Sequence, residues 1–353
     1  METEKVKIGF VGVGGMGQAA HLRHYVQVPE CEVVALAEIR PELGKKVAQK
    51  WGVSNVYTDV EEMLAKEKLD ALVASQPFTR HGTLIPALLK HGLPVLTEKP
   101  IAGSVEMGEK VLEAAKAAKV DMMIAYHKRS DLAAMAAKKE IDALKKSGEL
   151  GKMTYIRMIM PAGDWVANGF CQNIDSKEDF PPLEWDPPAS DMDKETYDAY
   201  GAFVNYYIHQ VNFIRYMLGE TWKPTYAASS GLMLAGESAS GISCTLEMSP
   251  YVTTIDWQEE VLVCFERGWI KVTLPAPLTT NRASKLEVFR DPGNGVAPKH
   301  EEIQLPWVGA MWQQARNFVA AVAGNRDVAC CTAGDALEDI KFAREYIRLA
   351  RGK

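Results

Sequence analysis

The sequence has no uninterrupted apolar run approaching the ~18 residues that a membrane-spanning helix requires. It begins with the charged segment METEKVKIGF, so we expect neither an export signal nor a membrane anchor. It also lacks a block of Lys or Arg, and its 40 basic and 46 acidic side chains give a formal net charge of −6. Such a chain does not attract nucleic acid or an anionic membrane, and we expect small molecules as partners.

The cysteine pattern argues against a disulfide scaffold and against a metal site. None of the six cysteines forms a C-x-x-C spacing, and only Cys330 and Cys331 are adjacent. We therefore predict buried thiols in a reducing cytoplasm and no bound metal. Repeats and low-complexity tracts are also absent, and 353 residues with 47% hydrophobic and 24% charged side chains are typical of a globular enzyme with two domains.

Residues 5–125 alternate short β-branched runs with amphipathic segments, which predicts an α/β domain with a parallel sheet covered by helices. The predicted strands are KVKIGFVGV, CEVVALAE, ALVAS, PVLTE and DMMIA. The predicted helices cover residues 16–27, 41–51, 59–66, 79–91 and 104–118. We therefore predict a doubly wound, Rossmann-type dinucleotide-binding domain over residues 1–126.

A different architecture is predicted for residues 127–353, which we assign to a second, α+β domain for substrate binding and oligomerisation. A helix over about 130–146, ended by Ser147-Gly148, leads into it. Successive strands separated by turn residues predict a large, mostly antiparallel sheet with one open face. These strands cover residues 152–160, 224–233, 239–248, 255–265, 268–274 and 284–290. Helices are expected at 308–323 and 332–350, the last of which could pack back on the first domain.

An insertion rich in Pro, Asp, Asn and Trp interrupts the strand series between Pro161 and Ser190. Loops of this length in compact domains are usually functional, and the aromatic residues argue against disorder. We expect the insertion to be ordered near the substrate site or at a subunit contact.

The first predicted strand ends in a G-x-G-x-x-G turn, formed by Gly12, Gly14 and Gly17 with Gly15 and Met16 between them. The first glycine allows the tight turn, the second lets a pyrophosphate approach the backbone, and the third permits close packing of helix and strand. Strand, turn, helix and second strand follow in the required order, so the motif predicts dinucleotide binding.

Glu38 ends the second predicted strand, about twenty residues after the glycines, where an acid accepts hydrogen bonds from the adenosine ribose. This favours NAD as the cofactor. Arg40 lies two positions further on and could turn toward a 2′-phosphate, so NADP stays open as the alternative.

Together with Glu98-Lys99-Pro100 at the end of a later strand, these motifs resemble the glucose-fructose oxidoreductase / inositol dehydrogenase / MocA family of sugar and cyclitol dehydrogenases. SQPFTRHGTLIPALLKHGLPVLTEKP is similar to the family segment that leads to its E-K-P signature. AYHKR at 125–129 and SGELGK at 147–152 are similar to later family segments. The resemblance covers most of the chain and implies a nicotinamide cofactor, a carbohydrate substrate and a homo-oligomer formed through the second sheet.

The resemblance also implies the site residues. A family pattern that ends in a catalytic His corresponds here to 200–212, where His209 is kept and the two usual acids are Asn205 and Asn212. Lys99 and His209 are therefore expected as the catalytic pair. Expected cofactor contacts, beyond the glycine turn, Glu38 and Arg40, come from Ser75, Gln76, Pro77, His81, Glu98, Lys99 and His127.

Elementary chemistry agrees with this pair. Oxidation of a secondary alcohol needs a hydride acceptor, a general base for the hydroxyl proton and a cation near the developing alkoxide, and Lys99 and His209 can supply the last two. Asn205 lies four residues before His209, so on one helix both would project from the same face. An amide cannot take a proton, and any proton relay through Asn205 must therefore stop at His209, Lys99 or water.

The substrate residues are predicted from position and side-chain type. Carboxylate, amide and flat aromatic groups suit the hydroxyls and apolar face of a sugar, although a surface lid or an oligomer contact uses the same types. The predicted substrate contacts are Lys99, His127, Arg129, Asp164, Trp165, Asn168, Asn205 and His209.

The leading hypothesis is an NAD-dependent oxidoreductase that acts on a secondary hydroxyl of a sugar, cyclitol or glycoside, with C3 of a glucoside as one candidate position. One alternative is a redox-neutral lyase or glycosidase that uses NAD transiently. Another is a non-catalytic NAD-binding regulatory protein, against which the retention of Lys99 and His209 argues.

Overall fold

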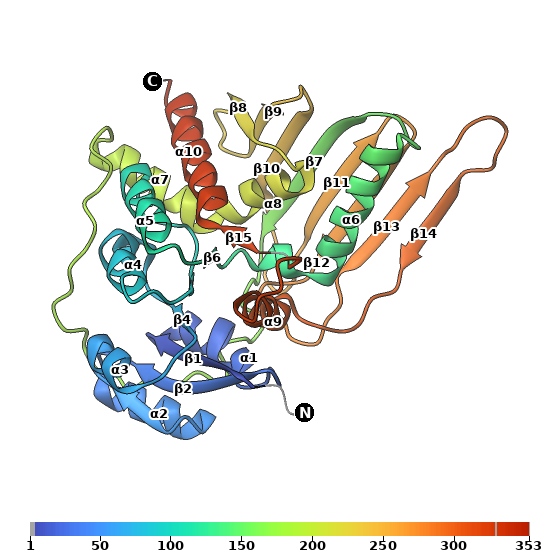
Figure 1. The fold of residues 1–353 in the computed structure, drawn as a ribbon. Coiled ribbons are helices and arrows are strands. Elements are labelled where there is room, and N and C mark those ends of the chain that lie inside the picture. The colour runs from blue at the N-terminus through green and yellow to red at the C-terminus, as the bar shows by residue number, and fades with distance from the viewer. Residues whose placement is uncertain (1–3, 329, 353) are drawn as a thin grey trace. The chain divides into compact units, whose positions relative to one another are not determined.

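The computed structural model describes residues 4–328 and 330–352, and its contacts divide the chain into two compact units (Figure 1). The first unit comprises Met1–Tyr126, Asn168–Tyr197 and Met311–Ile340. The second comprises His127–Ala167, Asp198–Ala310 and Lys341–Lys353. Most of the insertion and residues 311–340 thus pack with the first unit, although they come later in the chain.

The first unit is built on a seven-stranded sheet. Its strands are β1 (Val6–Val11), β2 (Cys31–Ala37), β3 (Asn55–Tyr57), β4 (Ala71–Ala74), β5 (Val95–Thr97), β6 (Met122–Ile124) and β15 (Cys331–Thr332). The order is β15-β6-β5-β4-β1-β2-β3, and all pairs are parallel except β15 with β6. This confirms the doubly wound sheet. Chain order reverses between β1 and β4, and ligands of such sheets bind outside the carboxyl ends of the strands at that point.

Helices connect these strands. They are η1 (Gly17–Leu22), α1 (Arg23–Tyr25), α2 (Pro41–Trp51), α3 (Val60–Lys66), η2 (Phe78–Arg80), α4 (His81–Leu89), α5 (Val105–Ala118) and α9 (Ala310–Val322). Their ends follow local chemistry: the Asp59 side chain accepts from the Glu61 amide at 2.7 Å at the start of α3, and Gly52 ends α2 with a φ of 70°. The helix predicted over 16–27 begins as a single π-helical segment, η1.

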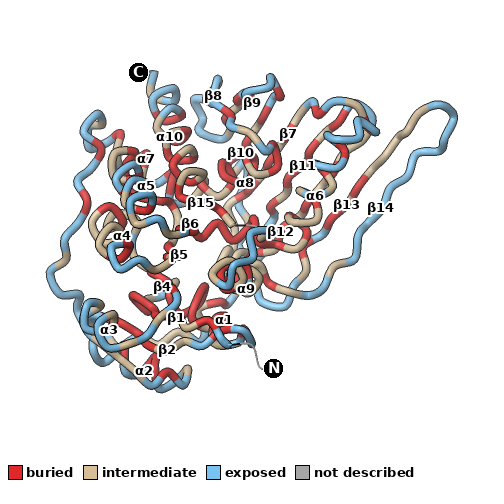
Figure 2. Tube along the Cα trace, viewed as in Figure 1, coloured by how far each residue is buried: buried red, intermediate tan, exposed pale blue. Residues whose placement is uncertain are grey.

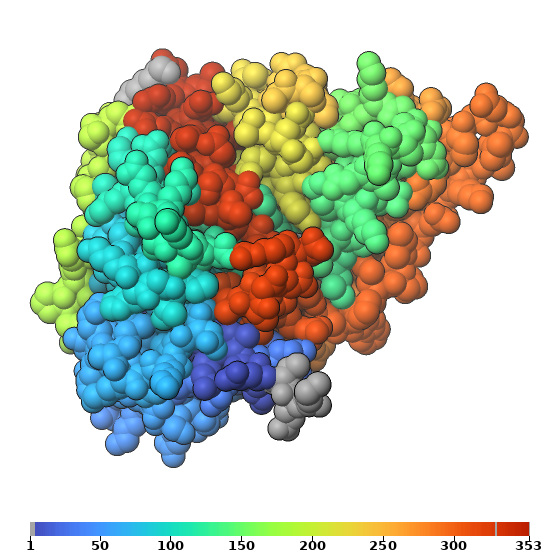
Figure 3. Space-filling view, in the orientation of Figure 1, coloured from blue at the N-terminus to red at the C-terminus, as the bar shows by residue number. Residues whose placement is uncertain are grey.

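The core of the first unit joins the first strands to a helix from far along the chain. Tyr25 packs edge-on against Phe10 of β1, with ring centroids 5.4 Å apart, and against Phe318 of α9 at 6.4 Å. All three rings are almost fully buried. Figure 3 shows the orange-red residues of α9 against the blue residues of the first strands. The segment 311–340 is therefore part of this core.

The second unit is built on an eight-stranded sheet. Its strands are β7 (Met153–Ala162), β8 (Trp222–Ala227), β9 (Met233–Ser238), β10 (Ser243–Val252), β11 (Glu259–Phe265), β12 (Gly268–Leu274), β13 (Lys285–Arg290) and β14 (Lys299–Ile303). The order is β14-β13-β12-β11-β7-β10-β9-β8, and only β7 and β10 pair in parallel. The predicted, mostly antiparallel sheet is confirmed.

Helices η3 (His127–Ser130), α6 (Leu132–Ser147), α7 (Lys194–Tyr206), α8 (Ile208–Leu218) and α10 (Ala333–Ala350) complete the described secondary structure. α6 packs on β12 and β13, and α8 packs on β7 and β10. Strand residues alternate between buried and half-buried, as in β11, whose residues from Glu259 to Phe265 follow that pattern without exception. In Figure 2, β14 is pale blue along its length, in keeping with its five exposed residues. One face of the sheet thus carries the helices, while the other carries the half-buried side chains.

Several sequence predictions needed correction. β3 and β14 were missed, because β3 has three residues and β14, KHEEI, carries charges instead of an apolar alternation. The strand predicted over 224–233 is two strands, β8 and β9, joined by a turn in which Gly231 has a φ of 72°.

Candidate functional site

The glycine turn after β1 has the geometry that a dinucleotide requires. Gly12 has a φ of 88°, and a Cβ atom there would lie 2.2 Å from the Gln76 side chain. A Cβ on Gly17 would lie 2.7 Å from the Gly12 carbonyl oxygen. At Gly14, by contrast, the nearest atom would be Arg40 Nη2 at 3.6 Å. The first and third glycines are required by packing, whereas the second leaves room beside the backbone, as the approach of a pyrophosphate demands.

Glu38 follows β2 and is 3% exposed. Its Oε2 accepts from the Val13 amide at 2.9 Å, and its Oε1 accepts from Arg40 Nε at 2.8 Å. The carboxylate is thereby fixed beside the glycine turn. A carboxylate has about four acceptor positions, so Glu38 can also accept from a ribose hydroxyl.

The loop after β4 lies at the carboxyl end of the neighbouring strand. The Ser75 amide and Gln76 Nε2 both donate to the Val11 carbonyl, at 3.0 and 3.1 Å. His81 is fully buried, and its Nδ1 contacts the Pro100 carbonyl at 3.1 Å. Burial lowers the pKa of His81, so the ring is neutral and braces the loop that carries Pro77 against the segment after β5.

Glu98 and Lys99 follow β5 on the same edge of the sheet. Glu98 Oε1 lies 2.7 Å from Nε2 of His21, a residue of η1 that the sequence analysis did not single out. Desolvation pushes the pKa of Glu98 upward, but the hydrogen bond and charge of His21 and the charge of Lys99 outweigh it and hold the pKa below its usual value. Glu98 is therefore a carboxylate that fixes the start of the E-K-P segment against the helix after the glycine turn, while Lys99 is half-buried beside it.

The second unit gathers its own set of predicted residues. The rings of His127 and His209 pack edge-on with centroids 4.8 Å apart. Arg129 Nε donates to Asn212 Oδ1 at 2.8 Å, and the Arg129 guanidinium lies 5.1 Å from the centroid of the Tyr216 ring. Asn212 thus has a structural task, since it orients a buried guanidinium two residues from His127.

Asn205 and His209 do not lie on one helix, which corrects the sequence prediction. α7 ends at Tyr206, Tyr207 interrupts, and α8 begins at Ile208. The Tyr207 hydroxyl bonds the Ser249 hydroxyl at 2.5 Å, a tertiary contact made at the interruption. Asn205 is exposed near the end of α7, and His209 is half-buried in the first turn of α8.

The predicted residues of the insertion separate between the two units. Asp164 and Trp165 belong to the second unit, and Asn168 belongs to the first. Asp164 Oδ1 accepts from the amides of Val166 and Ala167, at 3.1 and 2.9 Å, so this carboxylate shapes its own loop. Each unit thus has its own group of predicted residues, and no cluster of three His, Cys, Asp or Glu side chains suited to a metal occurs among residues 4–328 and 330–352.

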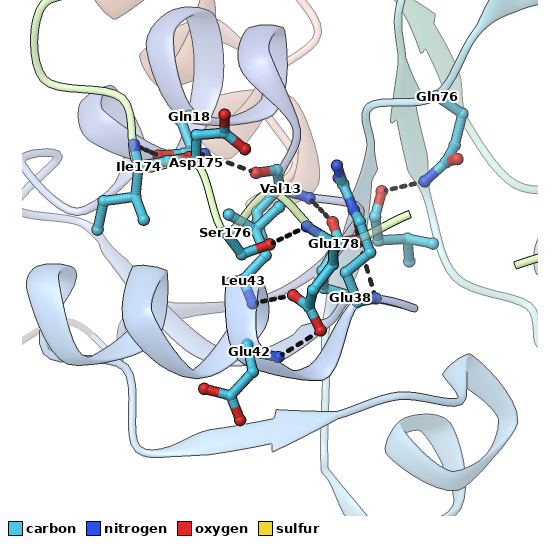
Figure 4. Close-up of polar contacts among 12 residues, drawn as sticks. Val13, Gln18, Glu38, Glu42, Leu43, Gln76, Ile174, Asp175, Ser176 and Glu178 are labelled. Atoms are coloured by element: carbon cyan, nitrogen blue, oxygen red, sulfur yellow. Dashed lines mark hydrogen bonds and ion pairs between the residues drawn. The ribbon is translucent and has the colours of Figure 1, made fainter. Parts of the chain in front are cut away.

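The close-up in Figure 4 shows contacts that the sequence analysis missed. Ile174 hydrogen-bonds the Gln18 side chain just after the glycine turn, and the Glu178 carboxylate points at the first amides of α2. These partners are more than 130 positions apart in the chain, so no local sequence motif predicts that they meet.

Comparison with known proteins supports the same interpretation. Residues 6–126 match the model of the GFO/IDH/MocA family, described as an oxidoreductase family with an NAD-binding Rossmann fold. The inositol 2-dehydrogenase of Rubrobacter xylanophilus is 33% identical over 113 residues, which is 32% of either chain. The scyllo-inositol 2-dehydrogenase (NAD(+)) of Bacillus subtilis is 25% identical over 215 residues, 61% of this chain and 54% of the relative. These two matches therefore span about a third and about half of the relatives' length.

The fold extends over the whole chain. The crystal structure of an oxidoreductase domain protein from Kribbella flavida superposes with a TM-score of 0.76 and 19% identity, covering 99% of this chain and 98% of that one. At this identity the likeness concerns the fold alone. Among the helices of the described residues, none combines the length and apolar character that crossing a bilayer requires.

Proposed function

Because this chain belongs to the Gfo/Idh/MocA family of oxidoreductases, we propose that it transfers a hydride between a nicotinamide cofactor and a secondary hydroxyl of a sugar, cyclitol or glycoside. The observation that carries this proposal is the glycine turn, where Gly14 leaves room beside the backbone, together with the fixed carboxylate of Glu38. Both lie at the point where the strand order of the first sheet reverses.

We further propose NAD as the cofactor, because the buried Glu38 carboxylate suits a free ribose 2′-hydroxyl and repels a 2′-phosphate. Gly12, Gly14, Gly15, Met16 and Gly17 would hold the pyrophosphate, and the loops of Ser75–Pro77 and Glu98–Lys99 would border the nicotinamide side. When bound, the cofactor supplies the hydride acceptor.

In this proposal the protein's part in the reaction is to move a proton and to stabilise charge. Lys99 is a cation whose charge acts on the neighbouring Glu98 carboxylate, and it is suited to stabilise the alkoxide of the substrate. His209, stacked edge-on against His127, is suited to take the hydroxyl proton. The remaining proposed substrate contacts are His127, Arg129, Asp164, Trp165, Asn168 and Asn205.

The test is an absorbance titration. Purified protein with NAD⁺ is mixed in turn with myo-inositol, scyllo-inositol, free sugars and aryl glycosides, including glucosides for which oxidation at C3 is checked, and the band of reduced nicotinamide is followed. A band that depends on one compound class supports the proposal and names the substrate. If NAD binds and a compound is converted without the band, the enzyme is redox-neutral. If NAD binds and no compound is converted, the protein has a regulatory role in place of an enzymatic one.

Two variants test the assigned residues. Lys99→Met should lower kcat by about 10²–10³-fold, as for a lost charge-stabilising group, and His209→Asn by about 10²–10⁴-fold, as for a lost acid–base group. Both should leave the Kd for NADH within threefold of the wild type. A variant that keeps full kcat would remove that residue from the catalytic pair.

We also propose a homo-oligomer in the cytoplasm. Cys31 and Cys244 are buried free thiols, as a reducing compartment favours, whereas Cys171 is exposed, against the prediction of buried thiols. The face of the second sheet without helices presents half-buried apolar side chains, among them Leu262 of β11 and the stacked pair Trp269 and Phe289, 5.9 Å apart. A second copy of the chain would cover this face. Light scattering should give a multiple of the chain mass, and Leu262→Arg should reduce it, while a monomeric wild type would contradict the proposal.

A further inference from the structure

The segment 168–186, here called the strap, runs along the carboxyl edge of the first sheet. Within the first unit the Asp186 side chain accepts from the Gly82 amide and the Thr83 hydroxyl, both at 2.8 Å, at the start of α4. In Figure 1 the strap is the yellow-green trace that passes beside α4. The strap is thus anchored to the first turn of α4.

At its other end the strap is tied to the glycine turn. Ile174 donates its amide to Gln18 Oε1 at 2.8 Å and accepts from Gln18 Nε2 at 2.9 Å. Asn173 Nδ2 donates to the Gly15 carbonyl at 3.0 Å. The Lys50 ammonium of α2 also donates to the Gln172 carbonyl. These bonds fix the backbone of the strap only a few residues before Glu178.

Glu178 occupies the start of α2. Its carboxylate accepts from the amides of Glu42, at 3.1 Å, and Leu43, at 2.8 Å (Figure 4). The N-cap residue of α2, Arg40, makes no side-chain capping bond, so the first turn receives its acceptor from a residue about 135 positions away. Free amides at a helix start attract anions, and here an internal carboxylate has taken that place.

Arg40, a cation whose charge acts on Glu178, also makes contacts of its own. Its Nε donates to Glu38 Oε1 at 2.8 Å, and its guanidinium lies 4.1 Å above the centroid of the Phe180 ring, which the strap supplies. The Ser176 hydroxyl, the amides of Glu42 and Leu43 and the charge of Arg40 outweigh desolvation and hold the pKa of Glu178 below its usual value. Glu178 is therefore charged at neutral pH.

We propose that Glu178 is a specificity-determining residue that excludes NADP. A 2′-phosphate on a ribose held by Glu38 would need free amides or an available cation beside it, and Arg40 and the first turn of α2, which begins three residues after Glu38, would have to supply them. Glu178 uses the amides, adds a second negative charge beside Glu38, and belongs to the same strap that holds Arg40 through Phe180. The proposal rests on the proposed function, since it assumes that the glycine turn binds a dinucleotide.

The experiment compares dissociation constants and needs no turnover. Wild type, Glu178→Gln and the matched control Asp179→Asn, an exposed neighbour with the same charge, are titrated with NADH and NADPH, and binding is followed by nicotinamide fluorescence. We expect the wild type to prefer NADH. Glu178→Gln should bind NADPH at least tenfold more tightly than the wild type and NADH within threefold, whereas Asp179→Asn should change neither. Higher ionic strength should reduce the wild-type preference more than that of Glu178→Gln, because salt screens the repulsion.

The outcomes separate the two proposals. If the wild type binds neither dinucleotide, the proposed function fails. If the wild type binds NADH but Glu178→Gln leaves the NADPH affinity unchanged, or if the wild type already binds NADPH as tightly as NADH, the role of Glu178 is refuted and the proposed function stands. If Glu178→Gln does not fold, Glu178→Ser, whose hydroxyl is also a hydrogen-bond acceptor, takes its place. The same tenfold tighter binding of NADPH relative to the wild type is then expected.

Discussion

Alanine substitution at Gly14 should weaken cofactor binding without loss of stability, whereas alanine substitution at Gly17 should lower stability. A methyl group on Gly14 has no neighbour closer than 3.6 Å, and the φ of Gly14 lies outside the left-handed region, so the backbone accepts alanine without strain. Replacing such a glycine changes the free energy of unfolding by at most about 1 kcal/mol, in the stabilising direction. The same methyl group fills the room that the pyrophosphate would use. The Kd for NADH should therefore rise tenfold or more, which corresponds to about 1.4 kcal/mol or more.

Gly17→Ala should lower the stability of the protein, and it should affect NADH binding only through that loss. Its Cβ would lie 2.7 Å from the backbone oxygen of Gly12, which is a backbone atom and cannot rotate away. Such overpacking costs about 1–3 kcal/mol of stability. Any loss of NADH affinity in this variant follows from the displaced helix, so it appears together with a lower unfolding midpoint.

Urea unfolding and NADH titration on the same preparations distinguish the two effects. Gly201→Ala in α7, where a Cβ meets nothing within 4 Å, is the matched control and should keep the NADH affinity. The reasoning is refuted if Gly14→Ala binds NADH as tightly as the wild type, or if it loses more than about 2 kcal/mol of stability, beyond what a tolerated Gly→Ala change allows.

Three further predictions concern the rest of the molecule. Burial lowers the pKa of His24 from 6.5 to about 3, so the unfolded chain binds a proton below pH 6.5 that the native protein rejects. Stability should therefore fall by about 2 kcal/mol between pH 7 and pH 5, and urea titrations of His24→Gln should lack this part of the loss. Lys128 and Glu259 form a buried ion pair at 2.5 Å, so Lys128→Met alone should cost about 3–5 kcal/mol. Adding Glu259→Gln, which removes the unpaired charge and keeps an acceptor for Gln210 Nε2, should recover part of it in the same assay. Gln18→Ala removes the bonds that hold the strap, and trypsin should then cut at the exposed Lys177 faster than in the wild type, with no change in rate contradicting the anchoring.

The strands and the glycine turn around the proposed cofactor site could be predicted because their signals are local. The glycine turn and Glu38 lie within about 25 residues, and each apolar run that precedes a motif is a buried strand of the sheet. The form of the helix after the turn was missed, since nothing in Gly17–Leu22 distinguishes a π-helix from an α-helix, and β3 was missed because it has three residues.

The contacts of the strap could not be predicted, although we expected this segment to be ordered and not disordered. Its composition indicates a functional loop, but Glu178 reaches α2 through bonds to backbone amides, which every residue carries. A tertiary contact also accompanies the break between α7 and α8. The spacing of Asn205 and His209 fits a single helix, but the helix is interrupted at Tyr207, whose hydroxyl bonds the Ser249 hydroxyl. Long-range contacts of this kind produce no hydrophobic periodicity or motif in the sequence from which they could be predicted.

The placement of residues 311–340 in the first unit has a consequence for how the protein is made. The core around Tyr25 and the edge of the sheet at β6 are complete only when Phe318 and Cys331 have been synthesised. At about 5–20 residues per second, the ribosome takes roughly ten to forty seconds to pass from the end of β6 to that point. During this interval the nascent first unit exposes the apolar side chains that α9 covers in the finished molecule. Final folding of this unit must therefore wait until most of the second one, residues 127–167 and 198–310, has been synthesised.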